Sequence, residues 1–229
     1  TFHSIFARIL RFEADKIGYP QSFTIYDTTD AKSLIKSIIK EEGLSDKLYK
    51  PAFVYNRISL SKNNLISPKA YAKHTELISD DECSGRPKLA EIYAKYSRRC
   101  FQAGAMDFDD LLYKTYELFK TSPESLYKYQ HMFRHILIDE FQDTNYVQYL
   151  IVKKLADVFQ NICVVGDDAQ SIYGFRGADI RNMLLFKKSY PELKTIKLEQ
   201  NYRSTKNIVE LANNVIKQNK EQLAKEIWT

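Results

Sequence analysis

Two adjacent acids, Asp139 and Glu140, follow an uninterrupted apolar run at residues 136–138. Such a run is typical of a strand that is buried on both faces, and in an open α/β sheet ligands bind where the strands end. There the two carboxylates can divide the work, since one can hold a hard divalent cation while the other takes a proton from water. For the pair taken alone, an acidic turn at the end of a strand is the competing interpretation.

Two further apolar runs also predict strands, and each leads into a polar cluster. Residues 162–165 precede a cluster that contains Gln170, and residues 196–198 precede one that contains Tyr202 and Arg203. Between the first two runs, apolar residues at helical spacing predict a helix over residues 147–158. Because a helix between two strands makes a parallel crossover, we expect an α/β sheet with its polar clusters at one edge.

Residues 1–13 predict a helix with one apolar face, formed by Phe2, Ile5, Phe6, Ile9 and Leu10. Thr1 and His3 fall in its first turn, where free amides and hydroxyls suit a phosphate group. For His3, a hydrogen-bonded residue at a helix start is an equally good interpretation.

The region from residue 28 to residue 105 is helical and more polar in pattern. A helix is predicted after a cap at Thr29 or Asp30, another opens at Ser67, and a third covers residues 89–102. Beyond this region, helices are predicted over residues 178–188 and after a cap at Ser204.

Some residues resemble metal ligands without having the right pattern. Asp107, Asp109 and Asp110 are spread around a predicted helix start, so capping and packing explain them better than a metal cluster does. The three cysteines form no CxxC pair, which argues against a zinc site and a disulfide framework. We expect Cys163 to lie in the core.

The composition is that of an ordinary soluble protein, with 44% hydrophobic and 28% charged residues, and we expect it to be cytoplasmic. No apolar run approaches the roughly 18 to 20 residues that cross a bilayer, and no signal segment opens the chain. The net charge of +5 favours a polyanionic partner only weakly. Basic residues of the helical region offer either a DNA-facing surface or, as we prefer, an ordinary solvated exterior: Lys62, Lys69, Lys73, Arg86, Lys88, Arg98 and Arg99.

Five segments together resemble the motifs of one enzyme family. The segments are TFHSIFARILR from residue 1, MDFDDLL from residue 106, ILIDEFQDTN from residue 136, VVGDDAQSIYGFRGADI from residue 164 and LEQNYRSTKNI from residue 198. In this order they resemble motifs Ib, Ic, II, III and IV of the superfamily 1A DNA helicases, the UvrD/Rep/PcrA family. The resemblance spans the whole chain.

The resemblance implies an ATP-dependent 3′ to 5′ DNA helicase that couples ATP hydrolysis to movement on single-stranded DNA and to duplex unwinding. Its cofactors would be ATP and Mg²⁺, and its partners single-stranded and partially duplex DNA, with repair or replication proteins and no membrane. By resemblance, Asp139 holds Mg²⁺, Glu140 activates water, Gln170 senses the γ-phosphate, Tyr202 stacks on adenine and Arg203 stabilises the transition state.

The same resemblance assigns residues to DNA. These are Thr1 and His3 at the start of the chain, and Tyr173, Phe175 and Arg176 after the second apolar run. The glycines around Phe175 and Arg176 let an aromatic ring and a cation project from a tight turn, where they can stack on a base and hold its phosphate.

The implied fold is a partial RecA-like parallel-sheet P-loop NTPase core with an inserted all-helical accessory domain. Residues 1–27 and 106–195 would belong to the first motor domain, residues 28–105 to the accessory domain, and residues 196–229 to the start of the second motor domain.

No GxxxxGK[ST] phosphate loop and no motifs V and VI occur in the chain, which also does not begin with Met. We therefore expect an excised fragment that is inactive as an ATPase by itself. Two other functions compete with the motor: a non-catalytic module that binds single-stranded DNA or docks a partner, and the motor part of a helicase-nuclease. The acid pair, Gln170 and Arg203 favour the motor, because a module that only binds has no use for them.

Overall fold

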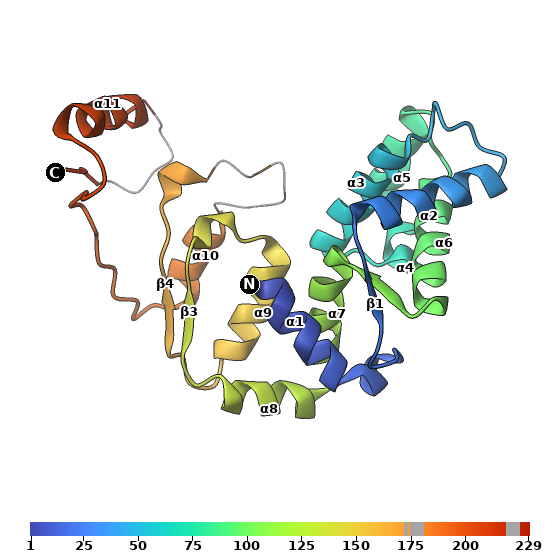
Figure 1. The fold of residues 1–229 in the computed structure, drawn as a ribbon, viewed down its shortest axis with the longest axis horizontal. Helices are drawn as coiled ribbons and strands as arrows, with labels where there is room; N and C mark the ends of the chain where they lie inside the picture. Colours follow the sequence, from blue (N-terminus) through green and yellow to red (C-terminus); the bar gives the residue numbers. More distant parts are fainter. Residues whose placement is uncertain (172–173, 175–180, 219–224) are drawn as a thin grey trace. The chain divides into compact units, whose positions relative to one another are not determined.

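The computed structural model describes residues 1–171, 174, 181–218 and 225–229. The chain forms two compact units. The first unit comprises Thr1–Ile136 and Tyr146–Ile162, and the second comprises Leu137–Asn145 and Cys163–Thr229. The chain combines helices with small sheets, as predicted for an α/β protein (Figure 1).

The elements of the first unit are α1 (Phe2–Phe12), η1 (Ala14–Ile17), β1 (Thr24–Tyr26), α2 (Thr28–Glu41), α3 (Pro51–Asn63), α4 (Pro68–Tyr71), α5 (Thr75–Cys83), α6 (Leu89–Gln102), β2 (Ala105–Asp107), α7 (Phe108–Thr121), α8 (Pro123–Met132) and α9 (Tyr146–Ala156). Strands β3 (Ile136–Ile138) and β4 (Ile162–Val164) begin at its boundary residues and continue into the second unit. The second unit also contains η2 (Phe141–Asp143), η3 (Asp168–Gln170), α10 (Arg181–Ser189) and α11 (Lys206–Ile216).

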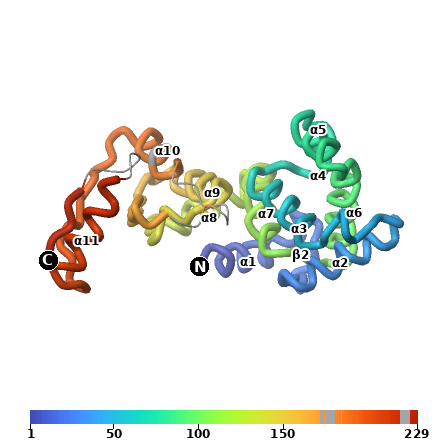
Figure 2. The backbone as a smooth tube through the Cα atoms, turned by 90° about the horizontal axis from the view of Figure 1, so that it is seen from above, coloured from blue at the N-terminus to red at the C-terminus, as the bar shows by residue number. Residues whose placement is uncertain are grey.

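In the first unit, β1 and β2 pair in parallel, with Thr24 opposite Ala105 and Tyr26 opposite Asp107. The chain therefore leaves β1, builds α2 to α6, and returns to the neighbouring strand. These helices lie together in Figure 2 and share one hydrophobic cluster, centred on Ile35, Tyr93 and Tyr96. A second cluster lies among α1, α7, α8 and α9.

Helix starts in this unit are set by local capping. Thr1, Asp27 and Asp107 each accept a hydrogen bond from the backbone of the first turn and form a capping box. The predicted cap at Thr29 or Asp30 is wrong, because Asp27 already satisfies the amides of both residues at 2.6 and 2.8 Å. On α1 the residues Phe6, Ile9 and Leu10 are buried as predicted, whereas Ile5 is 48% exposed.

Strands β3 and β4 pair in parallel. The Ile136 amide donates to the Asn161 carbonyl (2.9 Å) and the Val165 amide donates to the Ile138 carbonyl (2.8 Å), so the bonds advance in the same direction along both strands. The prediction of strands buried on both faces is wrong, since Leu137 is 78% exposed. Cys163, expected in the core, is also exposed.

The predicted third strand at residues 196–198 is not formed. These residues adopt no regular structure, and Ile196 and Leu198 are 71% and 77% exposed. Within the described part of the chain, the sheet that contains β3 has two strands only. A parallel strand is buried on both faces only where other elements, usually helices, cover both faces of the sheet, and the 78% exposure of Leu137 shows that its face is not covered.

Helix α11 begins one residue later than predicted. Its N-cap is Thr205 rather than Ser204, and no side chain caps it. Among its apolar residues Val209 is buried, whereas Leu211 and Val215 are 67% and 66% exposed. None of the helices described in the structure is both long and apolar enough to cross a membrane.

Candidate functional site

The acid pair lies in the turn that follows β3. Asp139 and Glu140 are both exposed, and the Glu140 amide donates to Oδ1 of Asp139 at 2.9 Å. Glu140 adopts a left-handed backbone conformation, with φ 52° and ψ 44°. A non-glycine residue in this conformation costs about 1–3 kcal/mol and is found preferentially at functional sites.

Gln142 joins this turn to the loop that follows β4. Its Nε2 donates to Oε2 of Glu140 at 2.7 Å, and its Oε1 accepts from the amide of Asp167 at 3.0 Å. The side chain is almost fully enclosed, since Gln142 is only 2% exposed. Sequence analysis missed Gln142, because a glutamine two residues beyond an acid pair carries no signal of its own.

The loop after β4 holds Gln170 through Asp167. Asp167 caps η3 by accepting from the Ala169 amide (3.0 Å), and its Oδ2 accepts from Nε2 of Gln170 (2.8 Å). Lys225 forms an ion pair with Asp167. Burial raises the pKa of Asp167, but the bonds from Lys225 and Gln170 outweigh it, so the pKa lies below its ordinary value.

Tyr202 and Arg203 lie in the loop before α11, as predicted. The Asn201 side chain accepts from the Arg203 amide at 2.9 Å, which shapes the turn. Tyr202 is 86% exposed and donates to the Gln200 side chain at 2.7 Å. Across the residues that the structure describes, no hydrogen bond or ion pair connects Tyr202 or Arg203 with Asp139 or Glu140.

Asp139 offers one carboxylate to a cation. In the described ranges, no three His, Cys, Asp or Glu side chains gather to hold a metal ion. A single carboxylate such as that of Asp139 can serve as a ligand of Mg²⁺, because this ion keeps several waters and shares phosphate oxygens instead of filling a cage of protein ligands.

His3, which was predicted to contact DNA, packs against an aromatic ring of the first unit. The His3 and Phe108 rings meet edge to face, with centroids 5.8 Å apart, and Phe108 is 43% exposed. Burial lowers the pKa of His3, which favours the neutral imidazole. Thr1 caps the same helix. Sequence analysis did not assign Phe108, whereas Tyr173, Phe175 and Arg176 lie outside the described residues.

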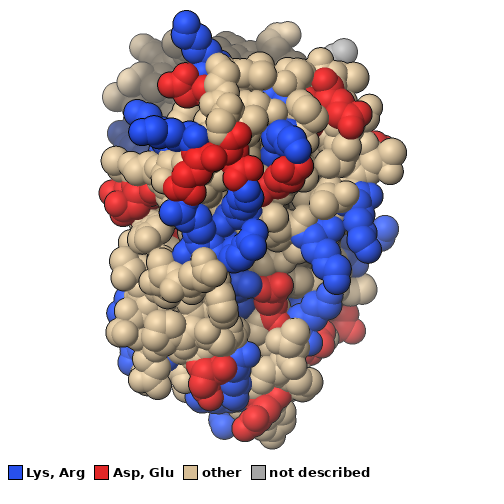
Figure 3. Space-filling view, turned by 90° about the vertical axis from the view of Figure 1, so that its right-hand side faces the viewer, with Lys and Arg blue, Asp and Glu red and all other residues tan. Residues whose placement is uncertain are grey.

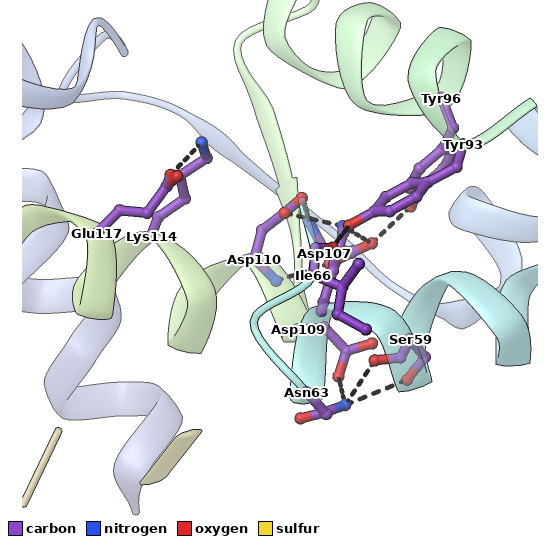
Figure 4. Close-up of polar contacts among 11 residues, drawn as sticks. Ser59, Asn63, Ile66, Tyr93, Tyr96, Asp107, Asp109, Asp110, Lys114 and Glu117 are labelled. Carbon is purple, nitrogen blue, oxygen red and sulfur yellow. Dashed lines mark hydrogen bonds and ion pairs between the residues drawn. The ribbon is translucent and has the colours of Figure 1, made fainter. Parts of the chain in front are cut away.

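The helix start of α7, which carries Phe108, is built on a buried cation. Figure 4 shows Asp107, Asp109 and Asp110 at this helix start, together with Tyr96. Nζ of Lys62 lies 2.7 Å from Oδ2 of Asp107 and 2.8 Å from Oδ1 of Asp110, and the Tyr96 hydroxyl donates to Asp107 at 2.7 Å. The prediction that these acids cap and pack is confirmed. A solvated or DNA-facing position for Lys62 is wrong, because the side chain is 2% exposed.

The contacts within this cluster of Lys62, Asp107, Asp110 and Tyr96 shift the pKa values of its members. Burial acts to lower the pKa of Lys62, but the two carboxylates outweigh it and hold the pKa well above its ordinary value. Burial acts to raise the pKa of Asp107, but Lys62 and Tyr96 lower it below its ordinary value. For Asp110, burial and the neighbouring Asp107 raise the pKa to about 6.

Other basic residues of the helical region pair with acids or donate to backbone carbonyls. Arg99 contacts Glu41 at 3.0 Å, Lys88 contacts Glu91 at 2.7 Å, and the Arg86 side chain donates to the Leu48 carbonyl. Figure 3 shows the Lys and Arg side chains of one face interspersed with Asp and Glu. This mixture favours an ordinary solvated exterior, as preferred from the sequence.

Comparison with known proteins gives consistent matches. Residues 1–191 match the model of the UvrD/REP helicase N-terminal domain. Over 229 residues the chain is 49% identical to the ATP-dependent DNA helicase PcrA of Staphylococcus epidermidis, covering 100% of this chain and 31% of that protein. It is also 49% identical, over 230 aligned residues, to the ATP-dependent DNA helicase PcrA of Staphylococcus aureus, of which it covers 30%. The chain thus spans about a third of the length of these relatives.

Proposed function

Because this chain belongs to the UvrD/REP helicase family, we propose that it acts in an ATP-dependent DNA helicase that moves 3′ to 5′ on single-stranded DNA and unwinds duplexes. Support for the ATPase comes from one observation above all. The turn that carries Glu140 and the loop that carries Gln170 follow neighbouring parallel strands and are bonded to each other through Gln142. This is the edge of an α/β sheet at which ligands bind.

In the proposed hydrolysis, Glu140 takes a proton from the attacking water and Gln170 contacts the γ-phosphate with its amide, which has both a donor and an acceptor. Asp139 would help to hold Mg²⁺, which neutralises phosphate charge when bound. Arg203 supplies a guanidinium for the charge that develops in the transition state, and Tyr202 stacks on the adenine. The exposure of Tyr202 and the loop position of Arg203 leave both residues accessible to a ligand.

For DNA, we propose contacts from Thr1, His3, Tyr173, Phe175 and Arg176. Phe108 is added to this set because its exposed ring packs against His3. An aromatic ring that keeps much of its surface in solvent can stack on a base of any sequence, which suits a translocating enzyme.

The proposed architecture is a RecA-like core that is interrupted by an accessory domain. The return of the chain from β1 to its parallel neighbour β2 after α2 to α6 supports an inserted helical domain at residues 28–105. Residues 1–27 and 106–195 are assigned to the first motor domain, and residues 196–229 to the start of the second.

The test is ATP hydrolysis by the complete gene product that carries these residues, measured with and without single-stranded DNA. Turnover that DNA stimulates and that Glu140→Gln lowers by about 10²- to 10⁴-fold is expected for loss of a general base. Glu76→Gln, an exposed change on α5, is the matched control. The 229-residue chain alone is expected to be inactive, because it contains no GxxxxGK[ST] segment. A folded wild type that binds DNA without hydrolysing ATP would instead identify a binding module.

A further inference from the structure

Gln142 occupies a position at which each end of its amide has one defined role. The donor end faces the Glu140 carboxylate at 2.7 Å, and the acceptor end faces the Asp167 amide at 3.0 Å. A carboxylate can only accept and an N–H can only donate, so the amide has one orientation that satisfies both partners. Because Gln142 is only 2% exposed, its amide depends on these two protein partners rather than on bulk water.

The backbone around Gln142 is shaped to admit this side chain. A Cβ added at Gly166 would lie 2.8 Å from Oε1 of Gln142 and 3.3 Å from the backbone nitrogens of Gln142 and Phe141. Any larger residue at Gly166 would therefore displace the amide or the turn that carries it. The close approach of the two loops depends on this glycine.

The two hydrogen bonds of Gln142 form a bridge between Glu140 and Asp167, and this bridge continues to Gln170 in the loop after β4. Asp167, whose amide bonds Gln142, uses its own carboxylate to accept from Gln170 and to pair with Lys225. A continuous series of contacts thus runs from Glu140 through Gln142 and Asp167 to Gln170.

We infer that Gln142 is a positioning residue, which orients the Glu140 carboxylate and ties its orientation to the loop that holds Gln170. This inference rests on the proposed ATPase function, in which Glu140 and Gln170 act on the nucleotide. A change in the loop after β4 is then transmitted to Glu140 through two hydrogen bonds. Gln142 touches no reacting atom and acts only through Glu140.

The first test is kinetic and uses the complete gene product. Gln142→Leu keeps the approximate volume but removes both bonds, and it is expected to lower kcat for DNA-stimulated ATP hydrolysis by about 10- to 100-fold through a misplaced Glu140. The KM for ATP should stay within about two-fold, since no nucleotide contact is lost. Gly166→Ala places a methyl group against Oε1 of Gln142 and should lower kcat in the same way. Gln102→Leu, at the exposed end of α6, is the matched control.

A double-mutant cycle separates positioning from general structural damage. In the Glu140→Gln background, Gln142→Leu should cause no further fall in kcat, because the residue it positions is already disabled. The inference would be overturned if the two substitutions lowered kcat independently, so that the loss in the double variant is the product of the two single losses. A normal kcat in the Gln142→Leu variant would overturn it as well.

The second test does not depend on turnover. Hydrogen exchange at the Asp167 amide should be slow in the wild type and accelerated in Gln142→Leu, with the Gln102→Leu variant unchanged. If the wild type hydrolyses no ATP, the proposed function fails while this measurement still decides whether the bridge exists. An Asp167 amide that exchanges equally fast in the wild type and in Gln142→Leu would refute the bridge itself.

Discussion

The ammonium group of Lys62 lies 2.7 Å from the carboxylate of Asp107, and both side chains are only 2% exposed. Lys62 comes from α3, whereas Asp107 ends β2 and caps α7. The ion pair therefore fastens the helices between β1 and β2 to the helix start that carries Phe108. Asp110 and Tyr96 complete the buried cluster.

Replacing the buried cation tests this arrangement. Lys62→Met leaves two buried carboxylates without their partner and is expected to lower the free energy of unfolding by about 3–5 kcal/mol. Urea unfolding of the chain measures the effect. Lys69→Met, an exposed change, should stay within about 0.5 kcal/mol of the wild type. Equal unfolding midpoints for the two variants would contradict the stabilising role of the cluster.

A pH dependence of stability follows from Glu13. Burial acts to raise its pKa, but hydrogen bonds from Lys128, Lys16 and Ser125 outweigh it and lower the pKa from 4.5 to about 2. Since the folded-state pKa is depressed, the stabilisation is fully present above the unfolded value and is lost as the pH falls from about 4.5 towards 2.

Urea unfolding at a series of pH values across this window measures the contribution of Glu13. Glu13→Gln should lower stability near neutral pH and flatten the dependence below about pH 4.5. Glu82→Gln, an exposed change on α5, is the control and should leave the curve as in the wild type. A Glu13→Gln curve that parallels the wild type throughout the acidic range would show that these contacts do not set the pKa.

The pairing of His3 with Phe108 predicts a contribution to DNA affinity. Phe108→Ala removes an exposed ring, and loss of one base-stacking platform costs about 1–3 kcal/mol of binding free energy. Fluorescence anisotropy with labelled single-stranded DNA should therefore show a Kd raised by about 5- to 150-fold. Phe12→Ala, which removes a ring that is 63% exposed on α1, should leave the Kd unchanged. Equal affinities for Phe108→Ala and wild type would remove Phe108 from the proposed surface.

Arg203 provides a test of transition-state stabilisation. Its side chain is exposed and its backbone amide bonds Asn201, so Arg203→Ala should leave the fold intact. In the complete gene product we expect kcat for ATP hydrolysis to fall by about 10³-fold or more. Arg203→Lys should restore little, because an ammonium lacks the planar fork of the guanidinium. Arg98→Ala, an exposed change on α6, is the control, and a normal kcat in Arg203→Ala would exclude the proposed role.

Structural features that depend on residues close together in the sequence were predictable from the sequence. Helix α6 spans the predicted residues 89–102, and the acids after Met106 cap and pack at the start of α7. These outcomes follow from apolar periodicity and from side-chain bonds within one turn, which need no distant partner. The five ordered motifs likewise identified the helicase family from the sequence.

Other features were decided only by contacts between distant segments. The charge on Lys62 indicates an exposed residue, yet carboxylates from β2 and α7 compensate for its burial. The apolar residues near Leu137 indicate a buried strand, but burial depends on the elements that cover the two faces of the sheet, which periodicity does not reveal. Gln142 gains its importance because parallel pairing of β3 and β4 brings Glu140 and Asp167 to the two ends of one amide. The sequence by itself determined the family and the starts of α6 and α7. Only the tertiary structure decided which polar side chains are buried and which partners they bond.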